Sequence, residues 1–388
     1  MKNILTLNSI SPVINDIFDK SYNVSADCDK PVGIMLRSFK MHDYELDQNT
    51  VAVARAGAGV NNIPVEKYAE QGVVVFNTPG ANANAVKELV LAGLLLGSRK
   101  IVDAIDWVKT LKGKGDEVGK LVEKGKSNFG GYEIKGKKLG VIGLGAIGAL
   151  VANAGDKLGM SVIGYDPFLS VDAALRLSTH VKVVKSLDVL FEECDYITLH
   201  IPYIANQNKG FINAEALSKM KNGVVIINCA RGELIDNGDM ITAVNSGKVA
   251  RYVCDFPADE IIGIENIVCI PHLGASTEEA EDNCAVMASK QLIDYIENGN
   301  IINSVNYPAC SMPRTTDFRL VILHKNINNI LAQITTVVGN EGINISNMSN
   351  KSRGDYAVTI LDTDVEVSEQ SIKHIQDVDG IIKVREIR

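Results

Sequence analysis

Residues 138–148 read Lys-Leu-Gly-Val-Ile-Gly-Leu-Gly-Ala-Ile-Gly, and this stretch decides the fold. The apolar run Leu139–Ile142 predicts a buried parallel strand. Gly143, Gly145 and Gly148 follow it at G-x-G-x-x-G spacing. The first glycine allows a tight turn, the second allows a close backbone approach, and the third lets the following helix lie near the strand.

A second apolar run, residues 161–165, ends at Asp166, about 20 residues beyond the glycines. Strand, glycine turn, helix, strand and acid in this order predict a dinucleotide-binding unit. A helical pattern follows and runs to about Leu158, and the free N–H groups at its N-terminus can bind the pyrophosphate. Asp166 can accept hydrogen bonds from both ribose hydroxyls and repels a 2′-phosphate. We therefore expect NAD as the cofactor rather than NADP.

Length and composition set broad limits on the class of protein. The chain has 388 residues, which favours two or three domains. Its net charge is −8 and it has no basic run, which argues against nucleic acid or an anionic membrane as partner. The N-terminus predicts a strand rather than a signal peptide, and no apolar stretch approaches the roughly 20 residues of a transmembrane helix.

The seven cysteines are scattered and form no C-x-x-C pair. We expect buried free thiols, no metal site and a reducing cytoplasm.

Alternation of apolar strands with helical patterns predicts an α/β protein with two Rossmann-like, doubly wound parallel-sheet domains. We expect an NAD-binding domain over residues 97–282. A discontinuous substrate-binding domain combines residues 1–96 and 283–307, joined by a long helix over 277–298. The Gly- and Lys-rich segment Lys112–Lys126 predicts an exposed loop.

The C-terminal part of the chain predicts a separate small unit. Residues 308–316 contain Pro308 and Pro313 and are expected to form a linker. Residues 317–388 follow a β-α-β-β-α-β order, which is typical of a ferredoxin-like fold. Such a sheet favours regulatory binding or dimerisation over catalysis.

Candidate chemical groups follow the predicted strands, where open α/β sheets bind ligands. Arg231 lies just beyond strand 224–228, and its planar fork can grip a carboxylate, although a surface ion pair is the alternative. His272 ends another strand and suits proton transfer, although a lone histidine at a strand end is more often structural. Asp259 and Glu260 are equally placed to orient its imidazole, and Asp255 can meet the nicotinamide edge.

Together these motifs resemble the D-isomer-specific 2-hydroxyacid dehydrogenase family from about residue 30 to 300. The resemblance rests on residues 139–148, Asp166, Leu199-His200-Ile201-Pro202, Asn228-Cys229-Ala230-Arg231-Gly232-Glu233 and Pro271-His272-Leu273-Gly274. It implies a catalytic trio of Arg231, Glu260 and His272, which favours Glu260 over Asp259. It also implies cofactor contacts at Gly143, Gly145, Ala146, Ile147, Gly148, Asp166, His200, Pro202, Cys229, Ala230, Asp255 and Gly274.

The tail resembles an ACT domain, a small amino-acid-binding module. The stretches His324-Lys325-Asn326 and Glu341-Gly342-Ile343-Asn344-Ile345 are similar to its serine-binding form. The resemblance implies that His324, Asn326 and Asn344 hold L-serine as an effector across a dimer of tails. Ile327-Asn328-Asn329 stands where Pro-Gly is usual, so the alternative is a tail that serves assembly only.

A family member with such a tail is expected to oxidise 3-phospho-D-glycerate with NAD to 3-phosphohydroxypyruvate, the first step of L-serine synthesis. Arg55 beside Gly57 would hold the phosphate, with Arg37 as a weaker candidate. The resemblance also implies a homodimer or homotetramer. The alternatives are a glyoxylate/hydroxypyruvate reductase, a D-lactate dehydrogenase, or a non-catalytic NAD-sensing regulator of the same fold.

Overall fold

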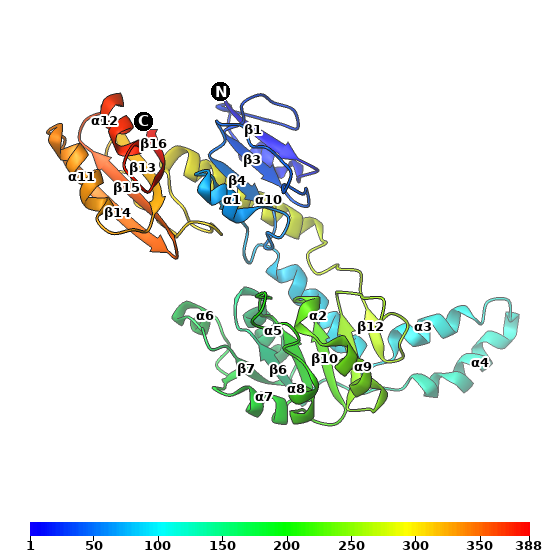
Figure 1. The fold of residues 1–388 in the computed structure, drawn as a ribbon. Coiled ribbons are helices and arrows are strands. Elements are labelled where there is room, and N and C mark those ends of the chain that lie inside the picture. The colour runs from blue at the N-terminus through cyan, green and yellow to red at the C-terminus, as the bar shows by residue number, and fades with distance from the viewer. The chain divides into compact units, whose positions relative to one another are not determined.

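The computed structural model describes the backbone of residues 1–388 and every side chain except that of Asp172. The chain packs as two compact units, Met1–Asn82 with Glu281–Arg388, and Ala83–Ala280. Each contains a parallel sheet, and the first also holds a small antiparallel sheet near the C-terminus (Figure 1). This architecture confirms the predicted α/β class, whereas the exact domain boundaries stay a prediction.

The unit Ala83–Ala280 is built on a seven-stranded parallel sheet of order β12-β11-β10-β9-β6-β7-β8. Its strands are β6 (Lys138–Ile142), β7 (Ser161–Tyr165), β8 (Lys182–Val183), β9 (Tyr196–Leu199), β10 (Val224–Asn228), β11 (Val249–Cys254) and β12 (Ile267–Cys269). The chain adds strands in one direction from β6 to β8 and in the other from β9 to β12. The order therefore reverses between β6 and β9, where doubly wound sheets bind ligands.

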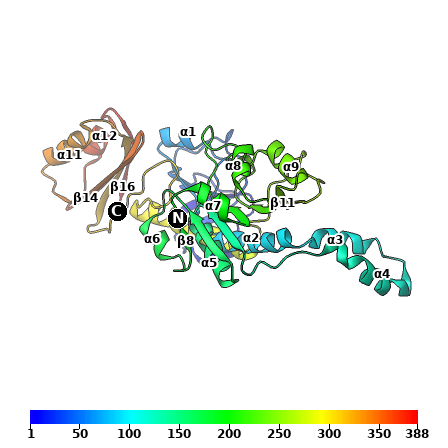
Figure 2. The same cartoon turned by 90° about the horizontal axis from the view of Figure 1, so that it is seen from below.

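Helices cover both faces of this sheet (Figure 2). The helices of this unit are α2 (Ala83–Ser98), α3 (Ile101–Lys109), α4 (Val118–Gly125), α5 (Ala146–Lys157), α6 (Val171–Leu175), α7 (Leu187–Glu193), α8 (Ala214–Lys219) and α9 (Asn237–Asn245). Val90 of α2 and Val151 of α5 belong to the apolar layer on one face. Leu190, Leu217 and Met240 of α7, α8 and α9 belong to the layer on the other.

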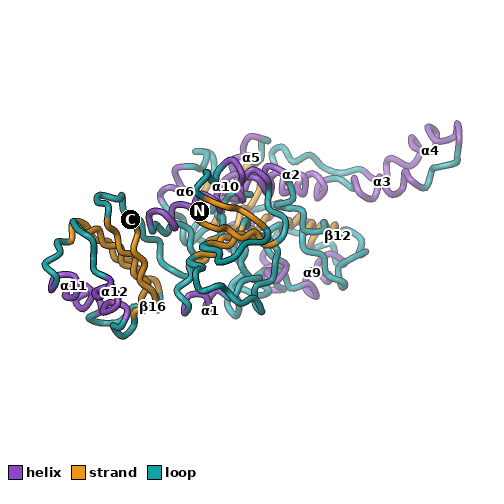
Figure 3. Tube along the Cα trace, turned by 90° about the horizontal axis from the view of Figure 1, so that it is seen from above, coloured by secondary structure: helices purple, strands orange, loops and turns teal.

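Helices α3 and α4 extend from this unit as an arm (Figure 3). The prediction of an exposed loop over Lys112–Lys126 is wrong, because α4 lies within it. The Trp107 ring packs against Phe129 with ring centroids 5.2 Å apart. A Cβ at Gly125 would collide with the same indole, so glycine permits this close contact rather than marking a loop.

The other unit begins with a five-stranded parallel sheet of order β2-β1-β3-β4-β5. Its elements are β1 (Lys2–Leu7), β2 (Tyr22–Ser25), β3 (Gly33–Leu36), β4 (Ala52–Arg55), α1 (Val65–Glu70), β5 (Val74–Phe76) and α10 (Glu278–Asn298). Ala285, Leu292 and Tyr295 of α10 pack in one core with Ile4 and Met35 of the sheet. The predicted long helix is confirmed, whereas the short strand β2 carries no clear sequence pattern.

The C-terminal part forms an antiparallel sheet of order β14-β15-β13-β16 with two helices. Its elements are β13 (Phe318–Lys325), α11 (Ile330–Asn340), β14 (Ile345–Arg353), β15 (Tyr356–Thr363), α12 (Glu369–Gln376) and β16 (Ile381–Ile387). This is the predicted β-α-β-β-α-β arrangement. Ile322 and Ile334 pack in a core under the two helices. Val321 and Val358, on the opposite face, join the core that contains α10.

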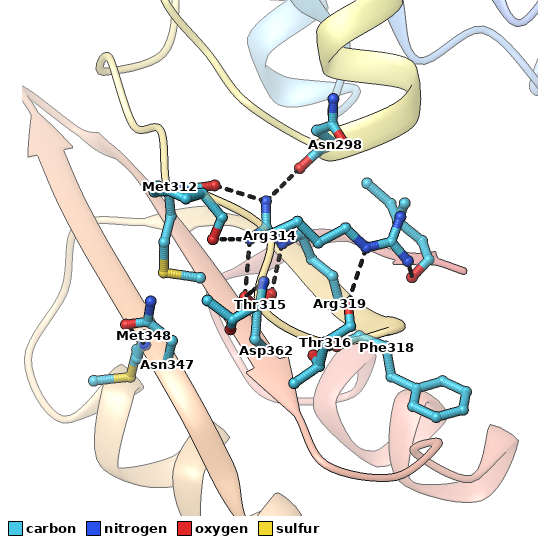
Figure 4. A network of polar contacts seen from close by, with 12 residues as sticks. Asn298, Met312, Arg314, Thr315, Thr316, Phe318, Arg319, Asn347, Met348 and Asp362 are labelled. Atoms are coloured by element: carbon cyan, nitrogen blue, oxygen red, sulfur yellow. Dashed lines mark hydrogen bonds and ion pairs between the residues drawn. The ribbon is translucent and has the colours of Figure 1, made fainter.

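The tail is anchored by Arg319, which is fully buried with its partner Asp362 (Figure 4). The Nε atom donates to Asp362 Oδ1 at 2.6 Å and Nη2 donates to Asp362 Oδ2 at 2.9 Å. The remaining guanidinium hydrogen bonds go to the carbonyls of Asn298, Met312 and Pro313. All five donors of the arginine are thereby used, and β13 is tied to the end of α10 and to the segment expected to be a linker.

Replacing Asp362 with Asn is expected to lower the free energy of unfolding by about 3–5 kcal/mol, because a buried guanidinium loses its countercharge. Burial raises the pKa of Asp362, but hydrogen bonds from Arg319 and Thr315 outweigh it and leave that pKa lowered. This stabilisation is thus complete above the ordinary aspartate pKa of about 3.9. It is lost as the pH falls through the folded-state value.

Urea unfolding of the two proteins between pH 3 and pH 7 measures this effect. The matched control is Glu366→Gln, which removes an exposed ion pair with Arg388 and is expected to cost less than about 1 kcal/mol. Equal, small losses in both variants would contradict the anchoring role of Arg319 and Asp362.

Candidate active site

The glycine turn lies at the reversal point of the seven-stranded sheet. Gly143 follows β6 with φ of +90°, and a Cβ there would lie 2.6 Å from the carbonyl oxygen of His200, which follows the neighbouring strand β9. A Cβ at Gly148 would collide with the carbonyl of Gly143, whereas one at Gly145 would meet nothing within 4 Å. The turn is therefore closed on the protein side and open at Gly145, which fits a pyrophosphate above the first turn of α5.

Asp166 directly follows β7 and braces this turn. Its Oδ2 accepts a hydrogen bond from the N–H of Leu144 at 2.9 Å, and its Oδ1 accepts one from Phe168 at 2.9 Å. Each carboxylate oxygen can still accept a second hydrogen bond. The acid can therefore hold the glycine turn and ribose hydroxyls together, a double duty that spacing alone does not reveal.

His200 stands beside the turn as a neutral imidazole. Its Nε2 lies 3.0 Å from Thr198 Oγ1, and burial lowers the pKa of His200 to about 3. The ring is thus uncharged at neutral pH, and Pro202 follows it just beyond β9. The sequence predicts cofactor contacts at both residues, and both lie just beyond the end of β9.

The remaining candidates follow three neighbouring strands, β10, β11 and β12. Arg231 follows β10, Asp255 follows β11, and His272 comes three residues after β12 ends at Cys269. Parallel strands end at one edge of a sheet, so these side chains share that edge. Phe256 connects them: its ring centroid lies 4.7 Å from that of His272, and a Cβ at Gly232 would lie 3.2 Å from its Cβ.

The loop that carries His272 is held by the buried carboxylate of Asp255. Asp255 Oδ1 accepts the N–H of Leu273 at 2.7 Å, and Oδ2 accepts the N–H of Gly274 at 2.8 Å. A Cβ at Gly274 would lie 3.0 Å from Oδ2, so glycine leaves room for the acceptor. Burial raises the pKa of Asp255, and these N–H groups and nearby His272 act against the rise. His272 itself has a left-handed backbone, with φ of +55°.

Arg231 is exposed on a loop that Asn228 braces from both sides. Asn228 Oδ1 accepts the N–H of Ala230 at 3.1 Å, and its Nδ2 donates to the carbonyl of Arg231 at 2.8 Å. The intervening Cys229 and Ala230 are buried. Arg231 Nη1 donates to the carbonyl of Ala230 at 2.6 Å, which leaves most of its guanidinium donors for a ligand.

Glu260 is exposed and points to a partner that the sequence did not suggest. Its Oε1 accepts a hydrogen bond at 2.7 Å from Nδ2 of Asn237, the first residue of α9. Among the described side chains, no hydrogen bond or ion pair joins Glu260 to His272. The structure brings Arg231, Asp255 and His272 to one edge and leaves Glu260 bonded to α9.

The candidate phosphate ligand Arg55 lies in the other unit, at the end of β4. Its Nε donates to the carbonyl of Arg37 at 2.9 Å, and its guanidinium fills the space that a side chain at Gly57 would need. Arg37 is committed to an ion pair with Glu281 at 2.5 Å.

The candidate effector residues lie at opposite ends of the tail sheet. His324 is buried at the end of β13, where its Nε2 lies 2.9 Å from Thr359 Oγ1, and Asn326 follows on the surface. Asn344 precedes β14, whose first residue Ile345 pairs with Thr363, which in turn pairs with Phe318 at the start of β13. Six residues of strand, roughly 20 Å, separate the two groups. One tail thus does not bring them together.

Replacing Asp255 with Asn is expected to loosen the His272 loop. The asparagine NH₂ group is a donor, so it cannot accept one of the two backbone N–H groups that Asp255 accepts. A hydrogen bond to a charged acceptor contributes about 1.5–3 kcal/mol. Hydrogen exchange at Leu273 and Gly274 should accelerate by about 10–100-fold, measured by mass spectrometry. Asp259→Asn, a change at an exposed acid nearby, is the control. Unchanged exchange in Asp255→Asn would contradict the holding role of Asp255.

Two absences bear on the kind of site. Within the described part of the chain, none of the helices combines the length and apolar character needed to span a membrane. The described residues also bring together no group of three His, Cys, Asp or Glu side chains that could hold a metal ion.

Comparisons with known proteins identify the family. Residues 91–274 match the model of the D-isomer specific 2-hydroxyacid dehydrogenase, NAD binding domain. D-3-phosphoglycerate dehydrogenase of Haemophilus influenzae is 30% identical over 347 residues, which cover 86% of this chain and 80% of the relative. D-3-phosphoglycerate dehydrogenase of Synechocystis is 38% identical over 263 residues, but these cover 66% of this chain and only 45% of the relative. The chain thus spans about half the length of that relative.

Solved structures agree with this result. The NAD⁺-bound 3-phosphoglycerate dehydrogenase of Entamoeba histolytica is 27% identical and superposes with a TM-score of 0.60. The match covers 79% of this chain and 98% of that structure. The chain therefore belongs to the D-isomer specific 2-hydroxyacid dehydrogenase family and carries its NAD-binding domain.

Proposed function

We propose that this protein oxidises 3-phospho-D-glycerate to 3-phosphohydroxypyruvate with NAD⁺, the first step of L-serine synthesis. The observation that carries the proposal is the shared sheet edge of Arg231, Asp255 and His272, beside a glycine turn fitted for a dinucleotide. Two relatives named D-3-phosphoglycerate dehydrogenase match most of this chain, which supports the choice of substrate.

Each residue of the edge has a separate task in this reaction. Arg231 binds the substrate carboxylate through two parallel hydrogen bonds. His272 accepts the proton of the hydroxyl group, and the left-handed loop held by Asp255 fixes the position of its ring. When bound, NAD⁺ supplies the acceptor for the hydride. Neutral His200 and the turn braced by Asp166 are proposed to line the cofactor site.

Glu260 is proposed to orient His272 and to raise the basicity of its imidazole. For this role the Glu260 carboxylate must give up the hydrogen bond that it accepts from Asn237. Both groups are exposed, so exchanging one hydrogen bond for the other costs little. Arg55 is proposed to bind the substrate phosphate through its guanidinium.

Two proposals concern assembly and control. Exposed apolar residues on the arm, Ile105 at 52% and Val108 at 48%, support a homodimer through α3, or a homotetramer if the tails also pair. L-Serine is proposed as an effector held by His324 and Asn326 of one tail and Asn344 of another. Two tails are needed because, within one tail, these residues lie at opposite ends of the sheet. Free thiols at the described cysteines support a cytoplasmic location.

Replacing His272 with Ala is expected to lower kcat by about 10²–10⁴-fold, because the proton acceptor is lost. NADH absorbance with 3-phosphoglycerate measures turnover, and NADH fluorescence should report nearly unchanged cofactor affinity. His374→Ala, at an exposed histidine of α12, is the control and keeps wild-type turnover. Full activity in His272→Ala would refute the role. An inactive wild-type protein that still binds NADH would favour the alternative of a non-catalytic, NAD-sensing regulator.

Replacing Arg55 with Ala is expected to lower kcat/KM for 3-phosphoglycerate by about 10–100-fold, the cost of a charge-assisted hydrogen bond. Turnover of unphosphorylated D-lactate or glycerate should change little. Lys112→Ala on the arm is the control. An equal kcat/KM for 3-phosphoglycerate in Arg55→Ala and wild type would instead favour an unphosphorylated substrate. Added L-serine in the same assay tests the tail, since an unaltered rate would contradict feedback.

A further inference from the structure

Two cysteines stand side by side at the edge that carries the candidate active site. Cys254 ends β11 and Cys269 ends β12, and the parallel register pairs them directly. Their sulfur atoms lie 3.8 Å apart. Among the described residues, no other pair of cysteine sulfurs is in such contact. Neighbouring parallel strands run about 4.8 Å apart, which lies within the Cα separations of about 4.4–6.8 Å that disulfides span.

Both thiols are linked directly to the groups proposed for catalysis. Cys254 precedes Asp255, whose carboxylate holds the N–H groups of Leu273 and Gly274. Cys269 is separated from His272 by two residues, and the carbonyl of Ile270 accepts the N–H of His272 at 2.9 Å. A displacement of either sulfur is therefore passed along one short, hydrogen-bonded loop to the imidazole.

The two thiols differ in access and in acidity. Cys254 is fully buried, and burial raises its pKa to about 12. Cys269 is only partly buried, with a pKa that burial also raises. Thiolate is the reacting form, so the partly exposed Cys269 is the thiol that meets an external oxidant first. A raised pKa leaves little thiolate at neutral pH, so we expect this oxidation to need sustained exposure to an oxidant.

We propose that Cys254 and Cys269 form a reversible disulfide that switches the active site off by displacing the His272 loop. The sulfur atoms must move from 3.8 Å apart to about 2.05 Å, the length of the bond. This movement pulls the ends of β11 and β12 together beneath Asp255 and His272. A misplacement of about 1 Å at a catalytic group can cost about 10²-fold in rate.

The reaction needs a disulfide such as oxidised glutathione as co-reactant. The Cys269 thiolate attacks one glutathione sulfur, breaks the glutathione disulfide and releases one glutathione thiolate, which takes up the proton that Cys269 lost. Cys254 then loses its proton and attacks the Cys269 sulfur, and the second glutathione leaves as a thiol. Two protein thiols are oxidised to one disulfide, and one oxidised glutathione is reduced to two thiols.

The test is incubation of the full chain with oxidised glutathione, followed by blocking of free thiols and peptide mass mapping. We expect a peptide pair linked through Cys254 and Cys269, removed by dithiothreitol. Cys269→Ser should not form it, while Cys28→Ser, at a cysteine of the other unit, should form it like the wild type. If wild-type Cys254 and Cys269 both remain free, or are modified only by glutathione, the proposal is overturned.

Turnover of the same samples tests the switch, and this arm alone depends on the proposed dehydrogenase function. Oxidised wild type and Cys28→Ser should lose activity by about 10²-fold and regain it with dithiothreitol, while Cys269→Ser stays active throughout. Cys254→Ala serves as a second variant should Cys269→Ser not fold. Full activity of the linked protein would overturn the switch. An inactive reduced wild type would count against the proposed function and leave the mapping result to decide the disulfide.

Discussion

The structure of the candidate site depends on the common edge at which β10, β11 and β12 end. Parallel strands place residues far apart in the chain at the same edge, and here they gather a guanidinium, a buried carboxylate and an imidazole. The Asp255 carboxylate holds the loop at this edge in place, because its two oxygens accept hydrogen bonds from the two N–H groups that follow His272. A surface loop with a left-handed histidine is thereby fixed to the end of a buried strand.

The residues proposed for the reaction belong to both compact units. The unit Ala83–Ala280 carries the glycine turn, Arg231 and His272, whereas Arg55 belongs to the other unit. In that other unit, Arg319 joins the C-terminal sheet to the end of α10 with all its donors used. The tail is thus fastened to the helix that leads back to residue 281, rather than suspended on a free linker.

Sequence alone predicts the parts of the site that depend on local spacing. In the structure the glycine turn and Asp166 directly follow strands, and Arg231 and His272 each come three residues after a strand ends. Contacts between distant side chains are harder to foresee. Asp255 was expected beside the nicotinamide, but no local pattern shows that it accepts the N–H groups of Leu273 and Gly274.

Other differences have similar physical causes. The bond from Asn237 to Glu260 joins a helix start to a distant loop, so no spacing rule indicates it. Helix α4 was missed because glycine and lysine suggest a loop, whereas Gly125 at its end lies against the Trp107 ring. In both cases tertiary contacts outweigh the local preference of the chain.

A crystal structure of the protein with NADH and 3-phosphohydroxypyruvate would test most directly whether Arg231 and His272 bind the same ligand. We expect the pyrophosphate over Gly145 and one ligand within hydrogen-bonding distance of both the Arg231 guanidinium and the His272 imidazole. Density that places these two side chains in separate cavities, with the ligand in contact with only one of them, would contradict it.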